Sequence, residues 1–249
     1  MTAPASSEPL PAADAPVAAP AKPTVWRKLF RNTSVIVGLS IVLIMVFIGL
    51  IAPLIATSDP TAINPGARNR FPMAESTMRL DDGTRATVKH YMGTDTLGRD
   101  VFSRVIYGAR VSIFIGVAVA ILSVSIGLVI GMAAGYVRWL DGIVMRIMDG
   151  LMAIPAILLA IAVVSLSRAG LLSVIIAIVV PEVPRVVRLV RSVVLSVREE
   201  PYVEAAVMSG TPTIKLIIRH ILPNTVAPLI VQGTFICASA ILVEAILSF

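Results

Sequence analysis

The sequence is short of charged residues, and this scarcity excludes most soluble folds. Only 14% of the 249 residues are Asp, Glu, Lys or Arg, whereas a soluble domain carries about 25%. In their place, 57% of the residues are hydrophobic and the mean hydropathy is +0.90. The apolar excess must face lipid, so the sequence predicts an all-α integral membrane protein.

Cysteine is nearly absent as well. The single Cys237 lies in an apolar run, so the chain can form no intramolecular disulfide, no CxxC redox motif and no cysteine-based metal site. No GxxxxGK[ST] phosphate loop occurs, which excludes that way of binding ATP. We expect no metal site and no cofactor. The net charge of +6 sits mostly in short segments between apolar runs, so nucleic acid is not an expected partner.

Five apolar runs are long enough to cross a hydrocarbon core of about 30 Å. The third is expected to kink at Pro155, and the fourth continues into a basic end. The runs are 35–56, 111–137, 150–167, a fourth from Ala169 through Glu182 to Arg185, Arg188 and Arg191, and 225–243. Arg138, Asp141, Arg146 and Asp149 are interpreted as a short cytoplasmic turn between the second and third runs, and Arg168 as a short outer turn.

Basic residues orient the chain and divide it into segments. Arg27, Lys28 and Arg31 precede the first span without an acid among them, which places the N-terminus in the cytoplasm. The predicted segments are a disordered cytoplasmic tail at 1–24, an anchor helix at 25–56, an extracytoplasmic loop at 57–110, and a transmembrane core at 111–249 with a cytoplasmic loop at 196–223.

The sequence of that cytoplasmic loop predicts two short helices joined at a glycine. Ser196 and Glu199 have capping-box spacing before the first helix, and Gly210 suits a C-terminal cap with positive φ. Thr211 is expected to cap the second helix with Pro212 at its first position.

The second helix of the loop is predicted to be amphipathic. Its apolar positions are Ile214, Ile217, Ile218 and Ile221, and Pro223 with Asn224 is expected to end it. A helical loop that merely lies on the membrane surface fits these residues as well as a docking element does.

The loop resembles the EAA loop of ABC importer permeases. The resemblance rests on Glu204, Ala205, Ala206, Gly210 and Pro223, together with His220, where the general pattern has an aliphatic residue. The ending RHILPN is similar to the dipeptide, oligopeptide and nickel subgroup. A single His near a helix end is interpreted as a cap or interface residue, not a metal ligand. The resemblance implies a coupling helix that docks in a groove of an ATPase subunit.

A second segment, Met92 to Ile113, resembles the C-type permease of peptide importers. Thr94 and Asp95 can cap a short helix, and two glycines allow tight turns. The segment's candidate residues are Gly93, Thr94, Asp95, Gly98, Arg99 and Asp100. Docking of a binding protein and an ordered turn without ligand contact both remain open for it.

The resemblance implies a type I permease-like helical bundle, with five spans visible where the family has six, so the chain is expected to be C-terminally short. It implies a subunit of an ATP-driven importer in the cell membrane that takes di- or oligopeptides from an extracytoplasmic binding protein. Because the partner ATPase subunits would hydrolyse the ATP, the resemblance implies that this chain is not an enzyme and needs no catalytic residue. Partners would be a second permease subunit, two ATPase subunits or domains, the binding protein and the lipid bilayer. Alternatives are a nickel or other small-solute importer, or a membrane transporter or scaffold outside the ABC class.

Two acids within or at the edge of spans, Glu182 and Glu244, are weak functional candidates, because an ionisable group is costly there. Glu182 lies three residues before Arg185, and the two are predicted to satisfy one another as a helical pair.

Overall fold

The computed structural model describes residues 32–79, 85–166 and 170–247. The predicted tail at 1–24, the basic residues before the first span, Arg168, Ser248 and Phe249 lie outside these ranges. The chain divides into two units, 1–45 and 46–249, and helix α2 (Thr33–Ile55) begins in the first and ends in the second.

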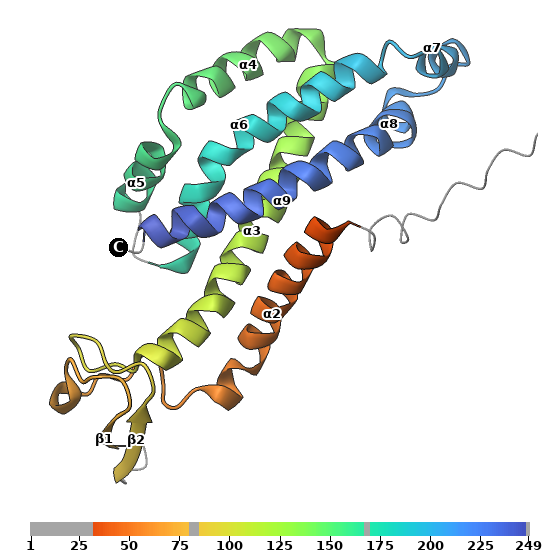
Figure 1. The fold of residues 1–249 in the computed structure, drawn as a ribbon. Coiled ribbons are helices and arrows are strands. Elements are labelled where there is room, and N and C mark those ends of the chain that lie inside the picture. The colour runs from red at the N-terminus through yellow and green to blue at the C-terminus, as the bar shows by residue number, and fades with distance from the viewer. Residues whose placement is uncertain (1–31, 80–84, 167–169, 248–249) are drawn as a thin grey trace, which may run out of the picture. The chain divides into compact units, whose positions relative to one another are not determined.

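Helices make up most of the second unit (Figure 1), in agreement with the predicted all-α class. They are α3 (Val101–Tyr136), α4 (Arg138–Met152), α5 (Ala156–Leu166), α6 (Leu171–Val197), α7 (Pro201–Met208), α8 (Thr213–Leu216), the π-helical turn η2 (Ile217–Ile221) and α9 (Leu222–Leu247). A 3₁₀ turn, η1 (Pro65–Ala67), and two strands, β1 (Ala74–Arg79) and β2 (Arg85–His90), precede α3.

The core is built on close packing of α3 against α6. Glycines recur every fourth residue on α3, at Gly127, Gly131 and Gly135, and they lie against valines of α6. A Cβ atom at Gly131 would lie 2.7 Å from the Cβ of Val190 and 2.8 Å from the carbonyl oxygen of Val187. Without side chains at these positions the two backbones can approach each other, as in other small-residue helix pairs of membranes.

Three described helical segments are long and apolar enough to cross a membrane: 33–55, 101–136 and 213–247. The count rises to four if the bent pair α4–α5 is one span, so the predicted count of five is not reached on length and apolarity. The predicted fourth span is α6, a continuous helix of 27 residues in spite of Pro181 and Pro184. It is not among these three segments because its second half carries too many charged residues for a membrane-spanning stretch.

The chain bends at Pro155 as predicted, but the segment before the bend differs from the prediction. The expected cytoplasmic turn at Arg138–Asp149 is the 15-residue helix α4, and α4 and α5 are bent by 89° at the break before Ala156. The acids of this helix face α6: Asp141 binds Arg191, and Asp149 Oδ1 lies 2.6 Å from Arg188 Nη2. Charged residues that the sequence suggests are in a loop therefore form ion pairs between α4 and α6.

The junction before α9 also differs from the prediction. Pro223 and Asn224 do not end a helix, because they lie in the first turn of α9, directly after η2. Proline has no N–H that could donate to the carbonyl oxygen one turn back. The backbone before it widens into a π turn, in which the Leu222 N–H donates to the carbonyl oxygen of Ile217, five residues earlier. The predicted apolar face is only partly buried, since Ile221 is buried while Ile214 and Ile218 are exposed.

The predicted loop at 57–110 contains regular structure. β1 and β2 form an antiparallel pair in which Ser76 is opposite Val88, and α3 begins at Val101, well before the apolar run at 111. Helix α3 starts early because the side chain of Asp100 caps it by accepting a hydrogen bond from the Ser103 N–H at 2.8 Å.

Candidate functional site

The turn after α7 has the geometry expected from its glycine. Gly210 has φ +73°. Its N–H donates to the Val207 oxygen at 2.9 Å, and the Thr211 N–H donates to the Ala206 oxygen at 3.1 Å. This pair of bonds is the Schellman arrangement, which reverses the chain and satisfies the last carbonyls of the helix.

Both predicted N-terminal caps of the loop are displaced. Ser196 lies in the last turn of α6, and α7 is instead capped at Glu200 with Pro201 in its first turn. The second helix has Pro212 at the cap position, so it begins one residue later than predicted, at Thr213. A helix does begin near each predicted cap, but at a neighbouring residue. Several adjacent residues could serve as the first residue of each helix, and the sequence alone does not distinguish them.

The loop exposes apolar side chains on α7 and α8. Val203 and Leu216 are its buried anchors, whereas Met208 is 90% exposed and Ile214 is 73% exposed. Val207 is exposed beside them, and so are Glu204 and Ala205 of the EAA run. We call the exposed set Glu204, Ala205, Val207, Met208 and Ile214 the α7–α8 surface. Apolar side chains gathered on an exposed turn are typical of a surface that binds another protein.

The loop is tied to the start of α9. Asn224 Nδ2 donates to the Tyr202 hydroxyl at 3.0 Å and to the His220 carbonyl oxygen at 2.7 Å. The imidazole of His220 is partly buried, and its Nδ1 has no hydrogen-bond partner among the described residues. Pro223 is exposed in the first turn of α9. The predicted coupling residues therefore lie in one continuous segment with a fixed connection to a membrane helix.

The second candidate segment, 93–100, is an ordered turn built on two glycines. Gly93 has φ +76° and Gly98 has φ +77°. A Cβ atom at Gly93 would lie 2.4 Å from the Arg70 carbonyl oxygen, and one at Gly98 would lie 1.8 Å from that of Asn64. Both positions therefore require glycine, for conformation and for space.

Thr94 and Asp95 do not cap a helix, which corrects the prediction. Thr94 is buried, donates to the Ala67 carbonyl oxygen, and accepts from the Arg70 N–H at 2.9 Å. Asp95 accepts from the N–H groups of Leu97 and Arg99 and pairs with the side chains of Arg99 and Arg104. Burial works to raise the pKa of Asp95, but the hydrogen bonds from Arg99 and Leu97 outweigh it and lower that pKa.

Asp100 lies at the centre of a buried polar network. Its Oδ2 accepts from Ser103 and from the Thr57 hydroxyl at 2.8 Å, and its Oδ1 lies 2.9 Å from His90 Nδ1. His90 Nε2 in turn lies 2.7 Å from the Ser76 hydroxyl. Burial acts to raise the pKa of Asp100, but the hydrogen bonds from Ser103, His90 and Thr57 prevail and lower it. Because the carboxylate can only accept, His90 donates to it from Nδ1.

Sequence reasoning named Asp100 but missed its partners His90, Ser103 and Thr57. A signal existed for Ser103, which stands three residues after Asp100 at capping distance. None existed for Thr57, which lies just beyond the end of α2 and 43 positions from Asp100, so only the fold brings the two side chains together. The exposed side chains of Val207, Met208 and Ile214 were also not singled out as a surface.

The two candidate segments lie at opposite ends of α3, as Figure 1 shows. Asp100 caps its N-terminal end, whereas the carbonyl oxygen of Gly135 near its C-terminal end accepts from Arg198, which leads into α7, at 3.4 Å. A helix of 36 residues is about 54 Å long. The hairpin side and the α7–α8 side are therefore separated by more than a hydrocarbon thickness.

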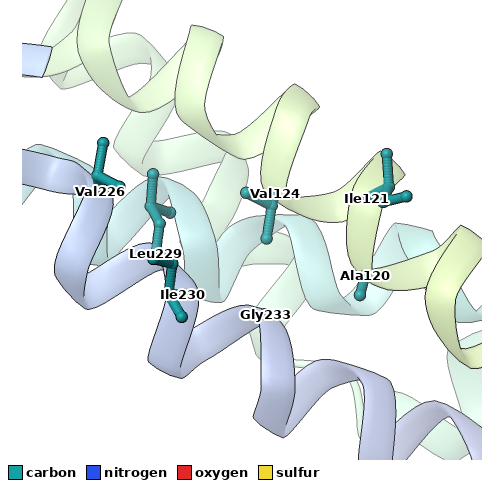
Figure 2. A pocket seen from close by; sticks show the side chains of 7 residues that line it. All are labelled: Ala120, Ile121, Val124, Val226, Leu229, Ile230 and Gly233. Atoms are coloured by element: carbon teal, nitrogen blue, oxygen red, sulfur yellow. The ribbon is translucent and has the colours of Figure 1, made fainter. Parts of the chain in front are cut away.

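An apolar groove of about 340 Å³ lies between α3 and α9 (Figure 2). Its lining is Ala120, Ile121 and Val124 from α3 and Val226, Leu229, Ile230 and Gly233 from α9. None of these side chains can donate or accept a proton, so the groove offers no catalytic chemistry. No cluster of His, Cys, Asp or Glu suited to a metal ion occurs within the described ranges.

Comparison with known proteins gives two family matches. Residues 123–249 match the family described as binding-protein-dependent transport system inner membrane component. Residues 24–72 match the N-terminal TM domain of oligopeptide transport permease C. The first match includes the α7–α8 surface, and the second includes all of α2.

Individual relatives align along most of the chain. A probable peptide ABC transporter permease protein of Sinorhizobium fredii is 48% identical over 226 residues, which are 91% of this chain and 72% of the relative. A dipeptide transport system permease protein of Alkalihalophilus pseudofirmus is 38% identical, with 90% and 71% covered. A di/tripeptide transport system permease protein of Pseudomonas aeruginosa is 36% identical, with 90% and 72% covered.

Proposed function

The chain belongs to the family of binding-protein-dependent transport system inner membrane components, and on this premise we propose that it is the C-type permease subunit of an ATP-driven importer of di- and oligopeptides. Relatives at 36–48% identity carry peptide or dipeptide transport in their names, and this supports peptide as the substrate class. A nickel or other small-solute importer is the alternative within the same family.

The proposed assembly contains a second permease subunit, two ATPase subunits or domains and an extracytoplasmic binding protein. The permease is a multi-pass membrane protein with its N-terminus in the cytoplasm, which puts the α7–α8 surface in the cytoplasm and the hairpin β1–β2 outside. ATP-driven closure of the ATPase subunits would move α7 and α8 as a rigid body and, through the tie at Asn224, the start of α9.

The observation that carries the coupling role is the exposure of the α7–α8 surface. Met208 is 90% exposed and Ile214 is 73% exposed at a turn whose backbone is fixed by Gly210. Lipid would also cover these apolar side chains if the loop lay on the membrane surface, and so would an unrelated partner of a scaffold, so the choice among the three rests on the family match. Docking on an ATPase subunit accounts for the surface together with the family match that includes it.

Two substitutions test coupling. Gly210→Pro removes the N–H that closes the turn and is incompatible with φ +73°. Glu204→Lys reverses the charge on the α7–α8 surface. Both are expected to abolish uptake of a radiolabelled alanine di- and tripeptide mixture by cells expressing the complete transporter, while the amount of protein in the membrane stays unchanged.

The control is Gly142→Ala on α4, where an added Cβ meets no atom within 4 Å, and it should transport normally. Affinity purification in mild detergent should recover a second permease and ATPase subunits with the unaltered chain, and less of the ATPase with Glu204→Lys. Normal uptake by both coupling variants, or transport by a chain purified free of ATPase subunits, would refute the proposal.

A further inference from the structure

Polar side chains form an exposed stripe along the second half of α6. The stripe consists of Arg185, Arg188, Ser192 and Ser196, all exposed and spaced by three or four residues, so they share one helix face. The first half of α6 exposes apolar side chains instead, Leu171, Leu172 and Ile176. The helix thus changes the character of its exposed surface midway along its length.

The packing of α6 against α3 fixes the depth of this change. Val186 lies against Gly127, where an added Cβ would be 2.5 Å from the valine Cβ. Gly127 is close to the middle of the uncharged run 111–137 of α3, and each helical residue advances about 1.5 Å. Arg185, the neighbour of Val186, therefore lies within about one helical turn of the centre of the hydrocarbon layer that α3 crosses.

A pair at that depth has one buried and one exposed partner. Glu182 is 5% exposed, and its Oε1 lies 3.1 Å from Arg185 Nη1. The side chain of Arg185 is 42% exposed. Its Nε and Nη2 have no hydrogen-bond partner among the described residues, since only Nη1 is used by Glu182. The Glu182 carboxylate thus accepts from Nη1 alone, and the Nε and Nη2 donors of Arg185 remain available to another acceptor.

Lipid cannot cover an exposed guanidinium at the membrane centre, because each unsatisfied donor there costs several kcal/mol in hydrocarbon. The face must border water or polar groups. A planar guanidinium with free donors matches a carboxylate in a bidentate geometry. We propose that Arg185, positioned by Glu182, lines the translocation path at mid-membrane and binds the carboxylate of the passing peptide. This inference rests on the proposed import of peptides.

Cysteine accessibility tests the location. In a Cys237→Ala background and in the complete transporter, Arg185→Cys should react with a charged, membrane-impermeant methanethiosulfonate in inside-out or right-side-out vesicles. Ile176→Cys is the control for a lipid-facing thiol, because residue 176 lies about 13.5 Å along the helix from residue 185 and about half a turn around it, on an exposed apolar surface. It should react at least about tenfold more slowly, as a lipid-facing thiol ionises poorly.

Charge rescue tests the role. Arg185→Gln should lower peptide uptake by about tenfold, the effect of losing one charge-assisted contact, and Arg185→Lys should retain most of it. In the Arg185→Cys variant, a reagent that attaches trimethylammonium should restore uptake in part, whereas one that attaches a sulfonate should not. Glu182→Gln should lower uptake less than Arg185→Gln, because the amide oxygen still accepts from the guanidinium.

The outcomes separate this inference from the proposed function. If the unaltered complex imports no peptide, the function is wrong. If it imports peptide but Arg185→Cys is as unreactive as Ile176→Cys, Arg185 faces a partner subunit and not the path. If Arg185→Cys is reactive but both attached groups, or Arg185→Gln, leave uptake unchanged, the side chain borders the path without binding the peptide, and the carboxylate contact is refuted.

Discussion

Asp100 illustrates how a single side chain can join three parts of the chain. It caps α3, binds Thr57 in the segment just after α2, and binds β2 through His90. Both carboxylate oxygens are used as acceptors, so the side chain joins the hairpin, the start of α3 and the segment after α2. Removing one acceptor oxygen from this buried carboxylate costs stability, because a buried donor then has no acceptor.

Asp100→Asn is expected to destabilise this network by about 1–3 kcal/mol. The amide replaces one acceptor oxygen by a donor, which must face either His90 or the Ser103 and Thr57 donors. Thermal unfolding of the purified protein measures the effect. Asp59→Asn makes the same chemical change at an exposed carboxylate whose hydrogen-bond partner within the described ranges is Thr61, two residues away, and it should leave the unfolding temperature unchanged. Equal effects of the two would contradict the assignment.

The lowered pKa of Asp100 gives the same prediction a pH dependence. A carboxyl whose pKa is lower in the folded protein contributes stability above its unfolded pKa, about 3.9, and loses that contribution as the pH falls through the folded value. The unaltered protein should therefore lose stability in this acidic range, and Asp100→Asn should lose less, because it no longer has the group that titrates.

At the scale of elements, the α3–α6 contact depends on what the glycines leave out. Gly127, Gly131 and Gly135 follow one face of α3, and each is in contact with a valine of α6. In a membrane, where lipid is as apolar as a leucine side chain, close backbone approach and tight packing replace the hydrophobic effect as the source of helix association. The exact fit of this face positions the polar stripe of α6.

Gly131→Ala should destabilise the bundle by about 1–3 kcal/mol, because its Cβ would meet both Val190 and the Val187 carbonyl oxygen, and a backbone atom cannot rotate away. Gly233→Ala on α9 is the matched control. Its Cβ would lie 3.5 Å from a Val124 methyl group, an ordinary contact, so the change should stay within about 0.5 kcal/mol. Thermal unfolding in the same detergent compares the two, and an equal loss for both would exclude tight packing as the cause.

At the scale of the whole molecule, α3 separates the hairpin from the α7–α8 surface. Thr87 on β2 and Ser209 after α7 are both exposed, and β2 and α7 lie toward opposite ends of α3 (Figure 1). If the N-terminus is cytoplasmic, the hairpin is outside and the α7–α8 surface is inside.

Labelling of intact cells tests this orientation. In the Cys237→Ala background, Thr87→Cys should react with an impermeant thiol reagent added to intact cells, and Ser209→Cys should react only after permeabilisation. The Cys237→Ala chain without an added cysteine gives the background signal. Reaction of Ser209→Cys in intact cells would invert the topology and remove the α7–α8 surface from reach of a cytoplasmic ATPase.

The sequence by itself determined the membrane class, the runs that became α2, α3 and α9, the positive-φ turn at Gly210 and the Glu182–Arg185 pair. Each of these depends on composition or on residues close together in the chain. A glycine that needs positive φ, a charge-free run of membrane length and an acid three residues from a base carry their physical consequence locally.

Only the tertiary structure decided which charged residues lie in loops and which form ion pairs between helices. Asp141 and Asp149 resemble a turn in the sequence, but they lie on a helix and pair with Arg191 and Arg188 of α6. The ends of helices around Ser196 and Pro223 were misplaced because α6 and α9 continue through weak local stop signals when packing supports them. The level of Arg185 along α3 likewise follows from the α3 glycines, since Val186 packs against Gly127 and only packing brings together two segments so far apart in sequence.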